Sequence, residues 1–266
     1  METYIVDSFT DEAFKGNPAG VCLVKTEIDD KLMQSIAIEL NLSETAFIRK
    51  LDETKYSIRY FSPKMEIPLC GHATLAASKI LMQFYNLEEI TFITSEKINL
   101  KIEQREDFIA MTFPIYHIKP TTPNSKLLTA LGLSKYIEAN YNEETRIIMI
   151  EIESKDVLAN LNPDFTALLS SQSDINGVLV TAIDRTPQYD FHSRYFWPWS
   201  GTNEDPVTGG THTFMAPYWA SKLKKKYLKS YQSSQRSGFM DIEILDSENL
   251  IILGVAKATF KGELLF

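Results

Sequence analysis

Short runs rich in β-branched and aromatic residues recur along the whole chain, and each run predicts a strand. Turn-forming residues separate the runs, which cover residues 4–6, 21–24, 45–48, 56–61, 90–93, 108–113, 147–152, 177–181 and 189–196. Strand signals are therefore more frequent than helix signals in this chain.

Three segments instead show the spacing of an α-helix. In 29–40, apolar residues recur every three or four positions and Asp29 stands where an N-cap belongs. Segment 74–84 has almost no polar face, which is typical of a buried helix. Segment 214–223 has a similar character, although Pro217 has to sit in its first turn or kink it.

The mixture of elements predicts an α+β protein with sheets wrapped around central helices. The length of 266 residues favours two domains. The segment 116–124, with two prolines and several turn formers, is the candidate linker. It gives domains 1–117 and 118–266, with a final strand near 257–266 that is a candidate to return to the first domain.

Composition and charge narrow the class of protein. Hydrophobic residues make up 44% and charged residues 23% of the 266 positions, as in folded globular proteins. The net charge of −8 disfavours nucleic acid as a partner. The one dense basic cluster, Lys222 with 224–226, follows an apolar run and fits a solvated helix end better than a binding patch.

Cysteine usage and the first residues indicate the compartment. Cys22 and Cys70 form no spaced disulfide framework, and the amino end lacks the features of a signal peptide. No apolar run approaches the length of a membrane span. We therefore expect a soluble cytoplasmic protein with no membrane partner.

A faint internal duplication is the most informative feature of the sequence. Residues 66–71 and 204–209 both read Glu-x-Pro-x-x-Gly, and each is followed by an apolar helix pattern that contains Ala-Ser-Lys. A glycine at a helix start lets a ligand approach unpaired backbone N–H groups, which favour an anion. Each loop alone could simply be a tight turn, but the pair predicts a carboxylate or enolate site formed by Gly71 and Gly209.

Three acid/base candidates lie at or near these loops. Glu44 follows the first predicted helix and begins an apolar strand, where desolvation would raise its pKa toward neutrality. His72 opens the central helix and Asp205 occupies the second loop. Each of the three could instead be structural, and Arg194 could pair either with a substrate carboxylate or with an acidic neighbour.

Other chemistries find little support in the sequence. The histidines and cysteines lack metal-ligand spacing, and no phosphate-binding glycine loop or serine-hydrolase elbow occurs. We expect no metal and no cofactor, which leaves acid/base chemistry.

Five motifs in order resemble the PhzF-like family of phenazine biosynthesis, which has the diaminopimelate-epimerase-like fold. They are Asp7-Ser-Phe-Thr with 16–21, Leu42-Ser-Glu-Thr-Ala-Phe, Glu66-Ile-Pro-Leu-Cys-Gly-His-Ala-Thr, Ser193-Arg-Tyr-Phe and Glu204-Asp-Pro-Val-Thr-Gly. The resemblance spans almost the whole chain. It implies two similar domains related by a pseudo-two-fold axis, each a curved, barrel-like, mostly antiparallel sheet around a central helix. It also implies an active site in a cleft between the two domains, no cofactor, and a homodimer.

The resemblance also implies roles for individual residues. Glu44 corresponds to the family's general acid/base, with His72 and Asp205 as its catalytic partners. Cys70, Gly71, Gly209, Gly210 and Thr211 are the expected substrate-binding residues. Family members usually carry a hydroxyl residue where this chain has Gly210, so one substrate hydrogen bond is lost or supplied by Thr211.

The function that follows is a cofactor-independent isomerase moving a proton on a small cyclic or conjugated carboxylic acid. Two alternatives stay open at this point. One is a non-catalytic binding protein that retains the fold, and the other is an amino-acid epimerase that uses Glu44 and Cys70 as opposed acid and base.

Overall fold

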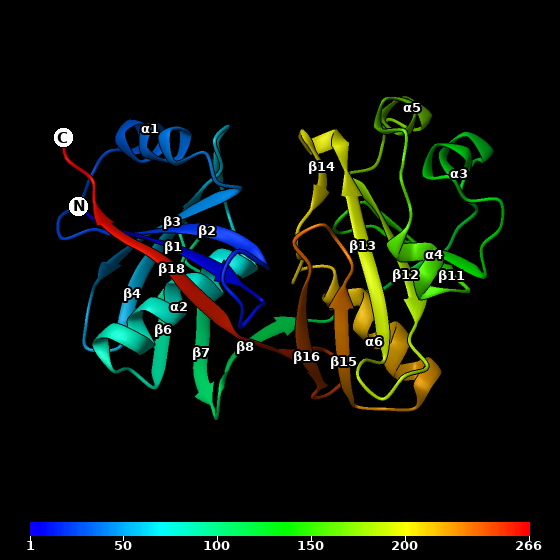
Figure 1. Ribbon diagram of the computed structural model, residues 1–266. Coiled ribbons are helices and arrows are strands. Elements are labelled where there is room, and N and C mark those ends of the chain that lie inside the picture. Colours follow the sequence, from blue (N-terminus) through cyan, green and yellow to red (C-terminus); the bar gives the residue numbers. More distant parts are fainter. The chain divides into compact units, whose positions relative to one another are not determined.

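The structure, a computed structural model, describes residues 1–266 and divides into two compact units. The first unit contains Met1–Thr112 and Ile251–Phe266, and the second contains Phe113–Leu250. The C-terminal strand β18 (Ala256–Glu263) pairs antiparallel with β1 (Glu2–Ser8), so both chain ends lie in the first unit (Figure 1). The division thus falls a few residues before 118, and the chain returns at 251 rather than 257.

The first unit is built from strands around one buried helix. Besides β1 and β18, its strands are β2 (Asn17–Leu23), β3 (Glu44–Lys50), β4 (Lys55–Phe61), β5 (Glu66–Ile67), β6 (Glu89–Ile93) and β7 (Asn99–Arg105). Its helices are α1 (Asp30–Leu40) and α2 (Gly71–Tyr85). Strands β8 (Phe108–Pro114) and β17 (Asn249–Gly254) carry the chain from one unit to the other.

The second unit has eight strands and four α-helices. The strands are β9 (Lys119–Pro120), β10 (Glu138–Asn142), β11 (Ile147–Ile152), β12 (Gly177–Ile183), β13 (Phe191–Trp197), β14 (Thr202–Asp205) and β15 (Tyr227–Gln232), followed by β16 (Gly238–Ile244) as an eighth at the unit's end. The helices are α3 (Ser125–Leu131), α4 (Lys155–Ala159), α5 (Phe165–Ser171) and α6 (His212–Leu223).

The order of strand pairings is the same in the two units. In the first, β1–β2 is antiparallel, β2–β3 parallel, β3–β4 and β4–β5 antiparallel, β4–β6 parallel and β6–β7 antiparallel. In the second, β10–β11, β11–β12, β12–β13, β13–β14, β13–β15 and β15–β16 repeat that series. The duplication seen in two short motifs therefore extends to topology, with Glu66 in β5 and Glu204 in the corresponding β14.

The sheets are mixed and mostly antiparallel, but they are not closed into the barrel-like form that the sequence led us to expect. In the second unit β9 consists of two residues, one of them a proline without an N–H donor. So short a strand ends the sheet instead of closing it.

The helices cover the sheets as their patterns predict. Asp29 caps α1 by accepting a hydrogen bond from the Leu32 N–H at 2.7 Å, as expected. Helix α2 is buried along most of its length and packs against β1, β2, β3 and β18. Its lack of a polar face is thus explained by contact with strands all around it.

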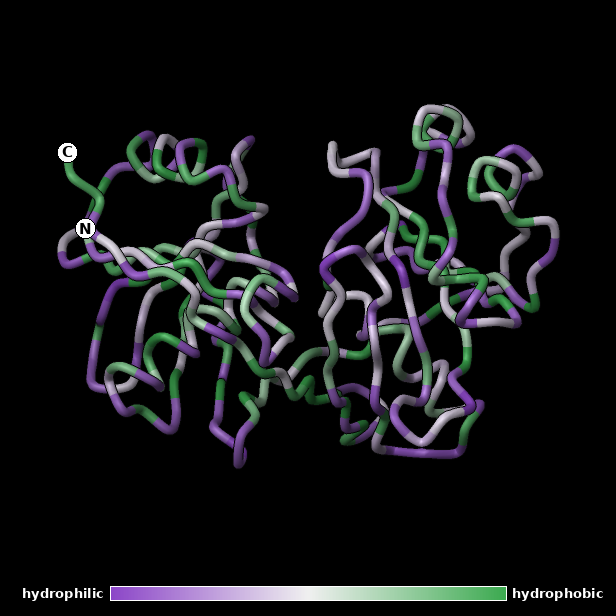
Figure 2. The backbone as a smooth tube through the Cα atoms, in the orientation of Figure 1, coloured by the Kyte–Doolittle hydropathy of each residue, from purple (hydrophilic) through white to green (hydrophobic).

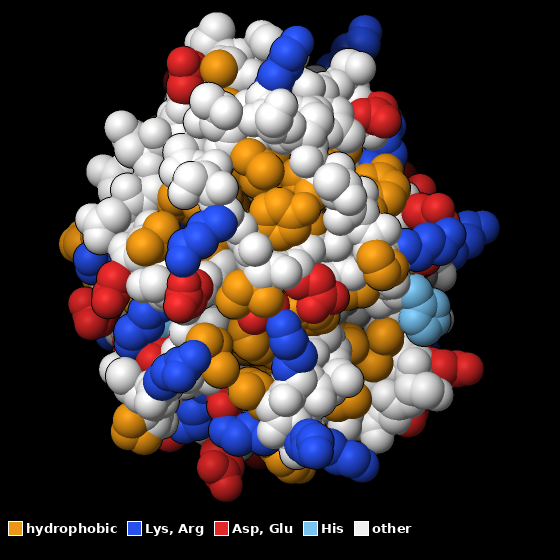
Figure 3. All heavy atoms as spheres, turned by 90° about the vertical axis from the view of Figure 1, so that its right-hand side faces the viewer, with side chains coloured by type: hydrophobic (Ala, Val, Ile, Leu, Met, Phe, Trp, Pro, Cys, Tyr) orange, Lys and Arg blue, Asp and Glu red, His pale blue; other side chains and the backbone are white.

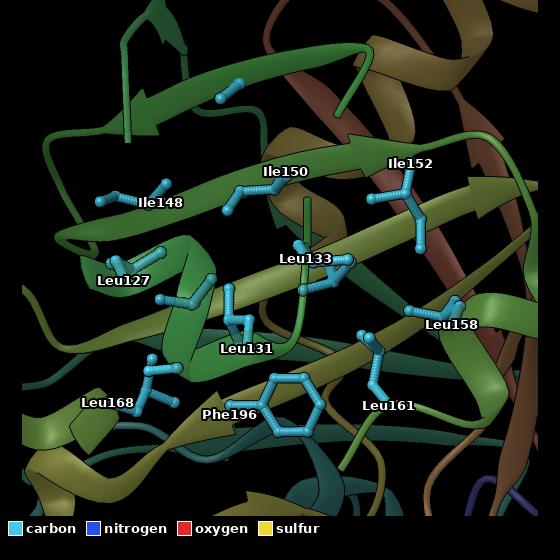
Figure 4. Close-up of a cluster of buried hydrophobic side chains, with 14 of the residues drawn as sticks. Leu127, Leu131, Leu133, Ile148, Ile150, Ile152, Leu158, Leu161, Leu168 and Phe196 are labelled. Atoms are coloured by element: carbon cyan, nitrogen blue, oxygen red, sulfur yellow. The ribbon is translucent and has the colours of Figure 1, made fainter. Parts of the chain in front are cut away.

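The second unit has a large hydrophobic cluster on the side of its sheet that α3, α4 and α5 cover (Figure 4). Figure 2 shows β11 and β12, which contribute to it, as mainly hydrophobic. Contributing side chains include Leu127, Leu131, Ile148, Ile150, Ile152, Leu158, Leu168 and Phe196. Helices α3 to α5 were not predicted, because segments this short are stabilised by packing rather than by their own periodicity.

Pro217 lies in the interior of α6, and not in the first turn. Proline leaves the carbonyl four residues earlier, that of Thr213, without its helical donor. The Tyr116 N–H donates to this carbonyl at 3.0 Å. The segment expected to be a linker therefore completes the hydrogen bonding of the helix.

None of the six helices is both long and apolar enough to cross a lipid bilayer. On the face shown in Figure 3, acidic and basic side chains are interspersed, and hydrophobic side chains lie between them. Basic side chains are most numerous toward the lower part of that face.

Candidate active site

Glu44 is the first residue of β3 and lies in the interior of the first unit. Helix α1 ends at Asn41, whose left-handed backbone (φ 49°) turns the chain toward the strand. Glu44 then pairs in register with Ala19 of the parallel strand β2. Its residual exposure is 8%, so the shielding that the sequence led us to expect is confirmed.

His72, in the first turn of α2, is the direct partner of Glu44. Its Nε2 atom lies 3.0 Å from Oε2 of Glu44, and both side chains are 10% exposed. Cys70, the residue before the helix, has its Sγ atom 3.4 Å from Nδ1 of His72. The structure thus brings together three predicted site residues, whose ligand atoms lie within 4.8 Å of one another.

Three polar residues that the sequence did not single out hold this cluster. The side-chain amide of Asn17 lies 3.4 Å from Nδ1 of His72, and Ser43 donates to the Asn17 oxygen at 3.1 Å. Ser8 donates to the His72 carbonyl at 2.7 Å. All three stand in motifs that carry the family resemblance, which is the signal that could have found them.

Burial and neighbouring groups act in opposite directions on His72. Desolvation disfavours the imidazolium, but the adjacent Cys70 and Glu44 side chains outweigh it and raise the pKa of His72 well above its usual value. Burial raises the pKa of the Cys70 thiol above that of an ordinary cysteine. The two neighbouring side chains thus favour the imidazolium form of His72.

The second unit positions Asp205 at the end of β14. Asp205 is 8% exposed and accepts a hydrogen bond from the Thr208 hydroxyl. Gln232 of β15 fixes the same loop, since its amide donates to the Asp205 carbonyl at 2.7 Å and accepts from the Thr208 N–H at 2.9 Å. The aspartate is therefore held in a defined orientation within its own unit.

The two glycine loops enter their helices differently. Gly71 is the first residue of α2, as expected, whereas α6 begins only at His212. The carbonyls of Gly209 and Gly210 accept hydrogen bonds from the N–H groups of His212 and Thr213 in a tight turn before the helix. Gly209 thus lies in a turn before α6, with Gly210 and Thr211 between it and the first residue of the helix.

Thr211 is buried within this second loop, and its hydroxyl is used in a hydrogen bond of the loop. It is 2% exposed, and its hydroxyl donates to the Thr208 carbonyl at 3.0 Å. Gly210 has open space where a Cβ atom would stand, with no other atom within 4 Å. No other side chain therefore fills the space next to Gly210, where the family resemblance leads us to expect a hydroxyl residue.

The glutamate of each repeated motif binds an arginine of the preceding long strand. Arg59 of β4 holds Glu66 through two hydrogen bonds of 2.8 and 2.7 Å. Arg194 of β13 holds Glu204 through two bonds of 2.7 Å. Each guanidinium also covers the phenylalanine two residues later, Phe61 or Phe196, at 5.2 and 4.9 Å from the ring centre.

These pairs decide a question that the sequence left open. Arg194 is used in an ion pair with its acidic neighbour Glu204, and its remaining guanidinium nitrogen donates to the Leu161 carbonyl at 2.6 Å. The repeated unit therefore consists of Arg-x-Phe on a strand, a glutamate that binds the arginine, and the Pro-x-x-Gly loop.

Comparison with known proteins shows the family and agrees with the fold. The family model described as phenazine biosynthesis-like protein matches residues 6–262. The chain belongs to this PhzC-PhzF family. A curated relative, an uncharacterized isomerase of Halalkalibacterium halodurans, is 42% identical over 98% of this chain and 97% of its own length.

Solved structures extend the likeness to three dimensions. A PhzF-family protein of Enterococcus faecalis superposes with a TM-score of 0.92 at 37% identity, covering 100% of this chain and 99% of the other. A predicted epimerase of Pseudomonas aeruginosa reaches a TM-score of 0.74 at 17% identity, covering 100% and 99%. The PhzF-family chain thus shares its fold with proteins described as epimerases.

Proposed function

We propose that this protein is a cofactor-independent isomerase that moves a proton on a small cyclic or conjugated carboxylic acid. Glu44 is the general acid/base in this proposal. The observation that carries it is the buried contact of 3.0 Å between Glu44 and His72 at the amino end of α2.

The geometry supports a division of labour between the two carboxylate oxygens of Glu44. Oε2 lies 3.0 Å from Nε2 of His72, and in our proposal Oε1 is the oxygen that meets the substrate. His72 is itself oriented by Asn17. A carboxylate held by one oxygen and offered by the other can take a proton from one carbon and return it to another without net oxidation.

The charge that develops during such a transfer also has a stabiliser nearby. The first-turn N–H groups of α2, which include those of Gly71 and His72, have no helical acceptor. Donors of this kind favour a carboxylate or enolate-like anion. The substrate class follows from this pairing of an acid/base with an anion-stabilising helix end.

The same geometry argues against the epimerase alternative. A two-base epimerase needs its acid and base on opposite sides of a carbon, each about 3 Å away, and so about 6 Å apart. The thiol of Cys70 and the carboxylate of Glu44 lie within 4.8 Å of each other. A single acid/base that serves both steps fits this spacing better.

In our proposal the loop of Asp205, Gly209, Gly210 and Thr211 also takes part in substrate binding, and the protein acts as a homodimer. The support for this part is the duplicated motif and the family resemblance. The printed description of the curated relative as an isomerase supports the reaction class.

Candidate aromatic and conjugated carboxylic acids, incubated with the protein in heavy water, test the proposal. We expect deuterium to enter the ligand with the native protein and not with Glu44→Gln. The matched control is Glu39→Gln, which changes an exposed carboxylate on α1 and should leave exchange unchanged.

Two outcomes would reject the proposal. Undiminished exchange by a folded Glu44→Gln variant would remove Glu44 from the chemistry. Tight binding of such acids with no deuterium incorporation by the native protein would favour the non-catalytic binding protein.

A further inference from the structure

A cavity in the first unit lies between the sheet and the segment that leads into α1. Its volume is about 130 Å³. All of its lining residues fall between 24 and 95, so the cavity belongs to the first unit alone. It lies apart from the Glu44 cluster, because Arg49, which lines it, comes five residues after Glu44 on β3, about 16 Å along the strand.

Part of the cavity wall is apolar. Phe47 of β3 and Met33 of α1 are both buried, and Val24 and Ile28 pack against the hydrophobic cluster to which these two residues belong. A cavity of about 150 Å³ lined by aliphatic and aromatic side chains is large enough for benzene. The cavity of the first unit is therefore suited to a compact aliphatic group, about as large as the side chain of valine.

Two side chains of opposite charge also line the cavity. Arg49 is half-buried, and Glu27 is exposed. The other arginine of the lining, Arg59, is already bound to the carboxylates of Asp30 and Glu66. Arg49 and Glu27, in contrast, form no ion pair with each other or with another residue. A small molecule that carries both a carboxylate and an ammonium group matches these two charges.

The duplicated topology shows what occupies the corresponding place in the second unit. Ser57, which also lines the cavity, pairs with Arg49 across β3 and β4. When the two Arg-x-Phe segments are aligned through their strand pairings, the equivalent pair in the second unit is His192 with Ala182. There the imidazole of His192 contacts the carboxylate of Asp184 at 2.9 Å. A carboxylate of the chain itself thus lies at this place in the second unit.

The first unit has no such carboxylate of its own. Asp184, which also binds Lys155 at 2.8 Å, is replaced there by Leu51. The backbone shows this equivalence. The N–H of Leu51 donates to the Lys55 carbonyl at 2.9 Å, and the N–H of Asp184 donates to the Asp190 carbonyl at the same distance. Leu51 is exposed and carries no charge, so a carboxylate for the arginine of the first unit has to come from solution.

We propose that this cavity binds one α-amino acid per chain, with an aliphatic side chain no larger than that of valine. Arg49 binds the carboxylate of the ligand, Glu27 binds its ammonium group, and the aliphatic side chain lies against Phe47 and Met33. Both charges of the ligand are then paired and its apolar part is buried, as a specific complex requires. The site shares no residue with the Glu44 cluster, so it does not depend on the isomerase function.

Three probes of similar shape separate the contributions of the two charges. L-valine carries both charged groups, isovalerate lacks the ammonium group, and isobutylamine lacks the carboxylate. Calorimetric titration of the full chain should give one equivalent of L-valine. Each analogue should bind about tenfold more weakly or worse, because it leaves one charged side chain of the cavity without a partner. Binding of either analogue as tight as that of L-valine would overturn the assignment to an amino acid.

Matched variants connect the binding with the two charged side chains. Arg49→Met should weaken the binding of L-valine by about tenfold or more. Arg185→Met, which removes an exposed arginine of the second unit, should leave it unchanged. Glu27→Gln should lower the affinity for L-valine to that for isovalerate. Equal affinity of the native chain and Arg49→Met for L-valine would overturn the site.

A measurement on the native chain locates the ligand without a change in the cavity. With ¹³C-labelled methionine methyl groups, the resonance of Met33 should shift as L-valine is added, whereas that of Met215, buried in α6, should not. A shift at Met215 alone, or no saturation by about 10 mM L-valine, would overturn the proposal. None of these readouts requires turnover, so failure of the proposed isomerase activity would be seen separately in the deuterium experiment.

Discussion

Arg194 and Glu204 form a two-point ion pair in which Nε and Nη2 each lie 2.7 Å from a carboxylate oxygen. Arg59 and Glu66 form the corresponding pair in the first unit. The pairs differ in burial: the side chains of Arg194 and Glu204 are 10% and 16% exposed, against 27% and 31% for Arg59 and Glu66. The same interaction is thus present at two levels of solvent screening.

The first prediction compares the removal of each arginine. Arg194→Met should lower the free energy of unfolding by about 3 kcal/mol, because it leaves the Glu204 carboxylate buried and unpaired. Arg59→Met should cost about 1 kcal/mol, since water reaches Glu66 more readily. Urea denaturation of the two variants measures both values, and an equal loss would contradict the role we assign to burial.

The double variant Arg194→Met with Glu204→Met provides the control. With no charge left behind, it should be more stable than Arg194→Met alone. If the double variant is the less stable of the two, the loss comes from packing against Phe196 and not from the stranded carboxylate.

The second prediction concerns pH and His212, which is buried at the start of α6. Burial lowers the pKa of His212 from 6.5 to about 4. The unfolded chain therefore takes up this proton at higher pH than the folded chain does, and stability is lost as pH falls from about 6.5 to about 4. The full difference is about 3 kcal/mol, and above pH 6.5 this residue has no effect.

Unfolding of the native chain and of His212→Gln across this range isolates the contribution. Other groups titrate equally in both proteins, so the difference between their stabilities should shrink as the medium becomes acidic. Parallel curves for the two proteins would show that His212 is not kept neutral by the fold.

The third prediction contrasts two glycines. A Cβ atom on Gly20 would lie 2.8 Å from the hydroxyl oxygen of Thr45 and 3.2 Å from Cδ1 of Leu40. We expect Gly20→Ala to cost about 1 to 3 kcal/mol through overpacking beside Glu44. Gly210 has no atom within 4 Å of the same position, so Gly210→Ala should change stability by no more than about 0.5 kcal/mol.

Thermal denaturation of the two alanine variants checks this contrast. Gly210→Ser introduces the hydroxyl that the family resemblance leads us to expect, at a position with open space for a Cβ atom. It should fold as well as the native chain. Destabilisation by Gly210→Ala comparable to that by Gly20→Ala would show that the space beside Gly210 is not open in solution.

Local features of the fold were predicted from the sequence because the signals that produce them are local. The period of 29–40 and the capping by Asp29 correctly placed α1, and runs such as 147–152 correctly placed strands. The repeated Glu-x-Pro-x-x-Gly motif pointed to the two loops. Helix starts were less accurate: α2 and α6 begin before residues 74 and 214.

Short and capped helices show where such signals fail. Asn124, Ser154 and Asp164 cap α3, α4 and α5 through hydrogen bonds to backbone N–H groups. Those caps were readable, but helices of five to seven residues cannot form alone. They exist because the cluster on β11 and β12 buries their apolar side chains.

The sequence by itself determined the family and the strand-rich character, and it singled out Glu44 and His72 as candidates, since each of these signals lies in short stretches of the chain. Tertiary structure alone decided that Glu44 meets His72, that Asn17 and Ser43 support them, and that the last strand pairs with the first. Such contacts join residues remote in sequence. Their geometry comes from the pairing of strands and the burial of α2, which no local pattern encodes.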